Sequence, residues 1–178
     1  MHPGRASLLW LNVVGGSAVL GSYAHGFASN PLTRSELWGG VPMALQPLYT
    51  ASMLLAALGY FAFSAFVFLR LDPERARIGG RFGFGAFHVL YALILLPSAL
   101  WLPLTFEMLE SPGRALWVVI RVTLGLVGLG SLGLVAAIAR VSPHSAPGSR
   151  RLALAGALAF SFQTALLDAL VWPAYFPL

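Results

Sequence analysis

Residues 115–139 read ALWVVIRVTLGLVGLGSLGLVAAIA, a long apolar run whose single charged side chain is Arg121. Because about 20 mostly apolar residues cross a bilayer as an α-helix, this run predicts a transmembrane span. Its glycines at positions 125, 128, 130 and 133 indicate close packing on more than one neighbouring helix. Four further runs of the same kind lie at residues 8–28, 47–69, 82–104 and 152–176.

The composition of the whole chain supports a membrane protein. Of its 178 residues, 58% are hydrophobic and 10% are charged, whereas about a quarter of the residues in soluble domains are charged. Leu, Ala and Gly dominate, which favours helices over the alternating strands of a membrane barrel. We therefore predict an all-α integral membrane bundle of five transmembrane helices, forming a single domain over residues 1–178. The absence of cysteine excludes disulfide and thiolate chemistry.

The distribution of arginine predicts the orientation of the bundle. Five spans place eight arginines on the side of the N-terminus and two, Arg34 and Arg114, on the other. The positive-inside rule then predicts a cytoplasmic N-terminus and an outside C-terminus, in a multi-pass protein of a bacterial membrane or, with the matrix-like side as inside, of an organelle. The net charge of +5 reports this orientation and not nucleic-acid binding. The eight arginines are Arg5, Arg70, Arg75, Arg77, Arg81, Arg140, Arg150 and Arg151.

The start of the chain also has some features of a secretory signal. Gly26-Phe27-Ala28 resembles a cleavage site. However, Asn12 and several small residues interrupt the preceding apolar run, and only one arginine precedes it. We expect the first span to be retained.

Two charges lie within the predicted spans. Arg121 lies about 9 Å below the outer end of the fourth span, and Asp168 about 12 Å below that of the fifth. Charged side chains in a membrane usually face a bundle interior or cavity and are paired. Because the two spans are joined by a short loop, we expect Arg121 and Asp168 to be able to meet, either as a structural tie between helices or beside a ligand.

Aromatic and polar side chains gather in the same outer layer. Of the five tryptophans, only Trp10 lies on the cytoplasmic side, whereas an interfacial belt would place tryptophans at both faces. This asymmetry favours an aromatic-lined pocket that opens outward, with residues 29–46 as its lid. The alternative is that each tryptophan only anchors the protein at the interface. The outer layer includes Trp38, Tyr49, Trp101, Trp117 and Trp172, with His25 and Glu107 as further pocket candidates.

Catalytic and cofactor motifs are missing from the sequence. It contains no His, Asp and Glu cluster at metal-ligand spacing, no supported Ser–His–Asp arrangement and no nucleotide-binding loop. His25 and His88 lie at different predicted depths, which disfavours a haem held between two histidines. We interpret His88, Asn12 and Gln163 as hydrogen-bonding packing residues, the last two between helices. No catalytic residue and no metal site are predicted.

Several short motifs resemble the TspO/MBR family, the tryptophan-rich sensory proteins and the mitochondrial translocator protein. Trp101-Leu102-Pro103 followed by Phe106 is similar to that family's W-x-P-x-x-F run. The segment from Ala165 to Trp172, ALLDALVW, resembles its A-x-L-N-x-x-x-W motif. Where the family usually has an acidic residue in the fourth span and Asn in the fifth, this chain has Arg121 and Asp168.

The resemblance implies a compact five-helix protein with a ligand cavity beneath the first loop. It also implies a tetrapyrrole, a sterol or another aromatic molecule as ligand, and frequent homodimers. Carried over position by position, the residues that line or support such a cavity are Trp38, Tyr49, Trp101, Trp117, Arg121, Asp168 and Trp172.

The leading functional hypothesis is a membrane binding protein for a flat hydrophobic ligand, acting as sensor, carrier or modulator. A small structural or assembly subunit of a larger membrane complex is the first alternative, and it predicts a filled bundle interior. The second alternative is a membrane enzyme that acts on a lipid or porphyrin. An adjacent arginine would keep Asp168 ionised, which suits a general acid or base poorly near neutral pH.

Overall fold

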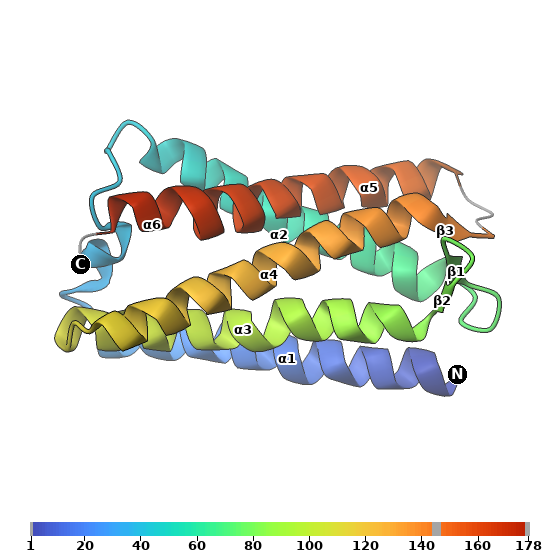
Figure 1. The fold of residues 1–178 in the computed structure, drawn as a ribbon, viewed down its shortest axis with the longest axis horizontal. Helices are drawn as coiled ribbons and strands as arrows, with labels where there is room; N and C mark the ends of the chain where they lie inside the picture. The colour runs from blue at the N-terminus through green and yellow to red at the C-terminus, as the bar shows by residue number, and fades with distance from the viewer. Residues whose placement is uncertain (1, 144–146, 177–178) are drawn as a thin grey trace.

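The computed structural model describes residues 2–143 and 147–176 and contains five helices long and apolar enough to cross a membrane (Figure 1). The prediction of an all-α five-helix bundle is therefore confirmed. The last span is one continuous rod built from α5, the π-helix η2 and α6. The elements are α1 (Pro3–Ser29), α2 (Gln46–Leu69), α3 (Gly85–Glu110), α4 (Arg114–Arg140), α5 (Pro147–Ser161), η2 (Phe162–Val171) and α6 (Trp172–Tyr175).

The third helix is longer than its apolar run. The sequence predicted an end at residue 104, whereas α3 continues to Glu110 and contains Pro97 and Pro103. In the turn that contains Pro103, the Thr105 hydroxyl donates a hydrogen bond of 2.8 Å to the Trp101 carbonyl. The apolar run is thus shorter than the helix that contains it.

A small antiparallel sheet at the arginine-rich end was not predicted. It consists of β1 (Arg77–Ile78), β2 (Phe82–Gly83) and β3 (Val141–Ser142) in the order β2-β1-β3. Gly79 and Gly80 form the turn between β1 and β2 with φ of 57° and 73°, values that glycine adopts without strain. Strands of two residues are too short to show alternation, so the sequence pattern could not reveal them.

The helices are arranged so that sequence neighbours are not always spatial neighbours. α1 packs on α3, α3 on α4, α4 on the fifth span, and α2 on α5 (Figure 1). α1 and α2 are not among the closely packed pairs, but the Tyr60 hydroxyl donates a 2.5 Å hydrogen bond to Asn12 Oδ1 between them. This bond confirms the interhelical role predicted for Asn12. The loop of residues 30–45 connects the two helices.

Glycines set the distances between several helices. On α4, Gly130 and Gly133 face Leu90 and its neighbours on α3, and Gly128 faces Ala165 on η2, as the sequence indicated. Gly125 does not belong to these contacts, because a Cβ there would meet nothing within 4 Å. The closest contact joins α2 and α5: a Cβ at Gly59 would lie 2.3 Å from the carbonyl oxygen of Gly156. The two backbones can approach this closely only because both positions lack side chains.

Replacing Gly59 by alanine tests this contact. Although alanine favours a helix by roughly 1 kcal/mol over glycine, Gly59→Ala should lower stability by about 1–3 kcal/mol because α2 and α5 must separate. Gly21→Ala on α1 is the matched control, since a Cβ there meets nothing within 4 Å. Thermal unfolding of both variants in detergent should show a loss for Gly59→Ala alone, and equal midpoints would contradict the contact.

Candidate functional site

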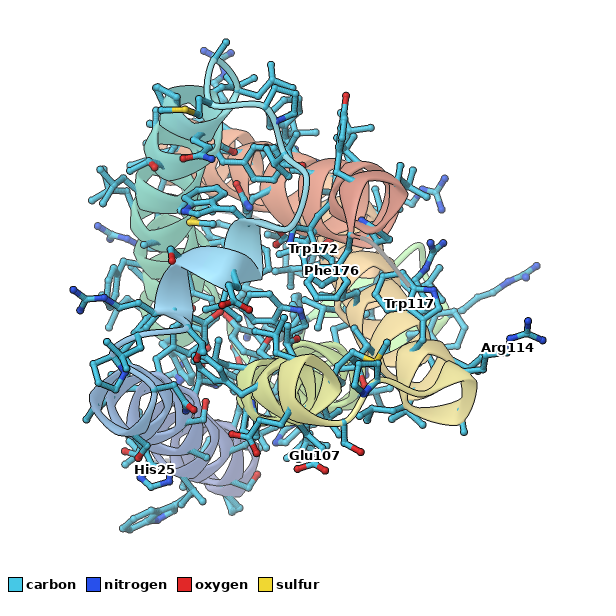
Figure 2. All side chains as sticks on the ribbon, turned by 90° about the vertical axis from the view of Figure 1, so that its left-hand side faces the viewer. His25, Glu107, Arg114, Trp117, Trp172 and Phe176 are labelled. Carbon is cyan, nitrogen blue, oxygen red and sulfur yellow. The ribbon has the colours of Figure 1, made fainter. Side chains whose placement is uncertain are left out.

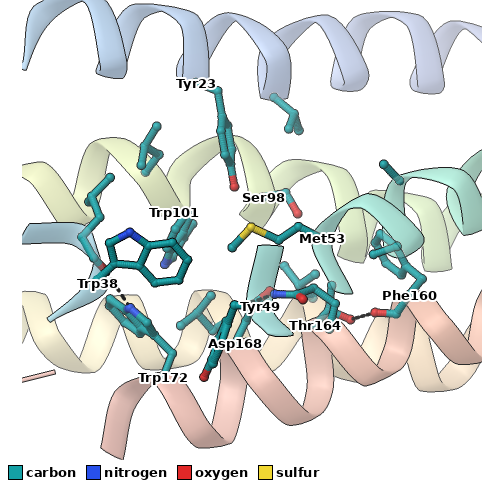
Figure 3. Close-up of a pocket in the computed structure, with 18 of the residues that line it drawn as sticks. Tyr23, Trp38, Tyr49, Met53, Ser98, Trp101, Phe160, Thr164, Asp168 and Trp172 are labelled. Atoms are coloured by element: carbon teal, nitrogen blue, oxygen red, sulfur yellow. Dashed lines mark hydrogen bonds between the residues drawn. The ribbon is translucent and has the colours of Figure 1, made fainter. Parts of the chain in front are cut away.

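A cavity of about 450 Å³ lies in the half of the bundle farther from the sheet (Figure 3). Its volume falls within the range of roughly 300–1,000 Å³ typical of small-molecule sites. Every long helix and the first loop contribute to its walls. The lining residues are Val19, Tyr23, Phe27, Arg34, Leu37, Trp38, Tyr49, Met53, Ala56, Ala57, Ser98, Trp101, Leu102, Leu124, Val127, Phe160, Gln163, Thr164, Asp168 and Trp172.

Five of the residues singled out from the sequence line this cavity. They are Trp38, Tyr49, Trp101, Asp168 and Trp172. The ring centroids of Trp101 and Trp172 are 6.0 Å apart in an edge-to-face arrangement, and those of Trp38 and Tyr49 are also 6.0 Å apart. Such contacts hold the rings in defined orientations. The cavity therefore has rigid aromatic walls, and the role of these residues in binding a ligand stays a prediction.

The first loop lies over the outer end of the cavity and is tied to the end of the chain. Its central 3₁₀ turn, η1 (Arg34–Trp38), is held by a 2.8 Å hydrogen bond from Trp172 Nε1 to the Leu37 carbonyl. The Gly40 amide donates to the Tyr175 carbonyl at 2.7 Å. A Cβ at Gly40 would lie 2.7 Å from that same oxygen, so the close approach requires glycine.

Asp168 owes its partner to the π-helix. In η2 the backbone hydrogen bonds run from i to i+5 instead of i to i+4. This widened spacing brings Gln163 and Asp168 to the same face, where Gln163 Nε2 donates a 2.7 Å hydrogen bond to Asp168 Oδ1. The prediction of an interhelical hydrogen bond for Gln163 is wrong, because its bond to Asp168 lies within one helix. π-Helical turns occur often at functional sites.

Two buried polar atoms on residues of the cavity wall have no hydrogen-bond partner within the described part of the chain. One is the donor Trp101 Nε1 and the other is the acceptor Gln163 Oε1. Gln163 is only 4% exposed. Buried polar groups are nearly always hydrogen-bonded, and leaving one unpaired costs about 1–3 kcal/mol. Two residues of the cavity wall, Trp101 and Gln163, therefore each carry a buried polar atom that is unpaired within the described residues.

The expected meeting of Arg121 with Asp168 is not observed. Arg121 is exposed and does not line the cavity. Among residues 2–143 and 147–176, the ion pairs are His2–Glu74 and Arg75–Asp72. The predicted depth places Arg121 along the axis of α4 but does not say which side of the helix it occupies. Successive helix residues point about 100° apart, and the buried face of α4 is that of Ile120, Thr123 and Leu124.

Trp117, His25 and Glu107 also lie outside the cavity lining. Trp117 stacks on Phe176 at 5.5 Å and lies 6.0 Å from Trp172, so it supports the wall from behind. His25 and Glu107 are exposed and lie at the outer edges of α1 and α3, away from the centre of the bundle (Figure 2). The position of a residue around the helix axis decides whether its side chain faces the cavity, and depth along the helix does not reveal that position.

Tyr23 and Arg34 also line the cavity, although no sequence motif marks them as site residues. Tyr23 extends from α1 into the cavity, with its ring 6.0 Å from that of Trp101 (Figure 3). Arg34 brings an exposed cation to the cavity lining at η1. In the sequence Arg34 indicates only the orientation of the bundle, because nothing in the loop places it at the cavity.

No protein-family model, curated protein or solved structure matched the chain in the comparisons made. In the described ranges, no group of three or more His, Cys, Asp or Glu side chains could hold a metal ion.

Double-mutant cycles can separate the expected ion pair from the observed hydrogen bond. Combining Arg121→Leu with Asp168→Leu should give a coupling energy below about 0.5 kcal/mol, whereas Gln163→Leu with Asp168→Leu should give roughly 0.5–3 kcal/mol. Chemical unfolding in detergent supplies both values. A large coupling in the first cycle would mean that the arginine and the carboxylate do meet.

Trp172→Phe tests the attachment of the lid. The substitution keeps an aromatic ring but removes the donor to the Leu37 carbonyl, so backbone amides of residues 34–40 should exchange with deuterium several times faster. Trp117→Phe is the control because it removes an indole N–H from the same cluster without affecting that carbonyl. Unchanged exchange in Trp172→Phe would show that the hydrogen bond does not hold the loop.

Proposed function

We propose that this chain is a membrane protein that binds a flat, mostly hydrophobic small molecule in the cavity beneath η1, and that it acts as a sensor, carrier or modulator. The observation that carries the proposal is a cavity with aromatic walls and one unpaired buried acceptor, Gln163 Oε1. Apolar pockets with a few convergent polar groups are typical of small-molecule sites.

The polar groups suggest how such a ligand would be oriented. Gln163 and Asp168 favour a donor at one end of the ligand, and the indole N–H of Trp101 favours an acceptor. Arg34 at the lid would attract a carboxylate. A tetrapyrrole carries ring nitrogens and carboxylates and would use all of these groups, whereas a sterol would use the apolar walls and one polar contact.

The TspO/MBR resemblance supports the same proposal. Its motifs include Trp101 and Trp172, which lie on the cavity wall below the first loop. The two departures from the family pattern have different consequences. Arg121 points away from the cavity, so it would leave the ligand unchanged. Asp168 lines the cavity and, in place of Asn, would favour a ligand with an additional donor or a positive charge.

The cavity also bears on the two alternative functions, a structural subunit and an enzyme. A purely structural subunit predicts a filled interior, which the cavity disfavours. For an enzyme, Asp168 would be the acid or base, but its observed polar partner is a glutamine and not a second catalytic group. Binding without turnover is the simpler use of these residues.

A fluorescence titration tests the proposal. A dicarboxylic porphyrin and a sterol are added separately to the protein in nanodiscs, and quenching of tryptophan emission is followed. Trp38→Ala should weaken both ligands about 2–10-fold through lost stacking, whereas Arg34→Gln should weaken the porphyrin alone. Trp10→Phe is the matched control, since Trp10 is 67% exposed on the distant half of α1.

The outcomes are distinct. Binding of the porphyrin with loss in Arg34→Gln supports a carboxylated ligand, and binding of the sterol without that loss supports a neutral one. If neither ligand quenches the emission, or if Trp38→Ala behaves as Trp10→Phe does, the proposal is wrong. Recovery of chemically altered ligand would instead favour an enzyme.

A further inference from the structure

A second hollow lies at the opposite end of the bundle, beside the small sheet. It is an open groove of about 960 Å³ between the β1–β2 turn, the beginning of α3 and the end of α4. It shares no lining residue with the cavity beneath η1. Its walls include Arg81, Phe82, Val89, Leu90, Ala136 and Arg140.

The two arginines of this groove are positioned by backbone hydrogen bonds. Arg140 ends α4, and its carbonyl accepts a 3.2 Å hydrogen bond from the amide of Gly79. The turn that begins at Gly79 carries Arg81, whose amide donates to the Ile78 carbonyl at 3.2 Å. The sheet therefore fixes the segments that carry both cations on one groove, although the cations are 59 residues apart in sequence.

Neither arginine is neutralised by an acidic side chain. Both are exposed, and among the described residues no Asp or Glu lines the groove. The two ion pairs in the described ranges use His2 and Arg75 as cations. Two such cations on one hollow favour an anionic group, and phosphate suits the planar donors of arginine.

The remainder of the groove is apolar and faces outward. Val89 on α3 is 59% exposed and Phe82 on β2 is 63% exposed. Gly133 on α4 approaches Leu90 so closely that a Cβ there would lie 2.6 Å from its side chain, which keeps the floor of the groove shallow. An exposed apolar furrow in a membrane-spanning helix pair is suited to a hydrocarbon chain.

We propose that this groove binds one anionic phospholipid, with its phosphate at Arg81 and Arg140 and an acyl chain along Val89 and Ala136. The positive-inside rule places this end in the cytoplasmic leaflet, which carries anionic lipids. That rule would be satisfied by arginines anywhere at this end. The presence of two of them in the wall of one apolar groove is the observation that favours a specific lipid.

Native mass spectrometry and thermal shift of the purified full chain test the site, with phosphatidylglycerol and phosphatidylcholine as probes. The combined variant Arg81→Gln, Arg140→Gln should weaken phosphatidylglycerol about 20–30-fold, at roughly fivefold for each arginine. Arg70→Gln, Arg151→Gln is the matched control: it removes two exposed arginines from the same end but outside the groove, and should change binding less than about twofold.

A third variant separates a lipid from a free anion. Ala136→Trp fills the exposed furrow and leaves both arginines in place, so phosphatidylglycerol binding should be lost while the fold persists. If Ala136→Trp has no effect and inorganic phosphate displaces the lipid, the groove is an anion site and the proposal is overturned. Equal binding of phosphatidylcholine, or equal losses in the two arginine pairs, would also overturn it.

Discussion

The contact on which the architecture depends is the approach of α2 to α5 at Gly59 and Gly156, where a single methyl group would meet backbone atoms. It holds α2 against the fifth span. On the other side, Gly15 and Gly26 let α1 lie against Leu95 and Leu102 of α3. α1 and α2 therefore pack on different helices, α1 on α3 and α2 on α5, and make little contact with each other. The cavity occupies the space left between them in the outer half.

The bilayer explains how much of this fold could be predicted. Every backbone polar group in hydrocarbon needs an internal partner, so apolar length alone reveals helices. The same measure fails where the solvent changes: it missed the last turns of α3 and the sheet beside Arg140. Depth identified Asp168 correctly as a group of the bundle interior, but depth contains no direction, so Arg121 was assigned the same role. The π-helix, which places Gln163 and Asp168 on one face of the fifth span, was not visible in the sequence pattern.

Arg121 has a different physical role from the one its charge suggested. On the outward face of α4 it lies among Val118, Val119 and Val122, which are exposed to the surroundings of the bundle. A long arginine side chain near a helix end can extend its guanidinium to the membrane surface while its methylene groups stay in hydrocarbon. Arg121 is only seven positions after Arg114, the first residue of the helix. This location reduces the expense of the charge without requiring a carboxylate.

Trp172 is one of the residues that join the first loop to the cavity wall, together with Trp38 and the Gly40–Tyr175 hydrogen bond. Its ring forms part of the cavity wall, and its indole N–H holds the loop that covers the outer end. Any occupant that rotates this ring must also release or tighten the loop. If the cavity binds a ligand as proposed, this one side chain would transmit its filling to the loop at the surface of the protein. A neighbouring molecule in the membrane could read the state of the cavity from the loop alone.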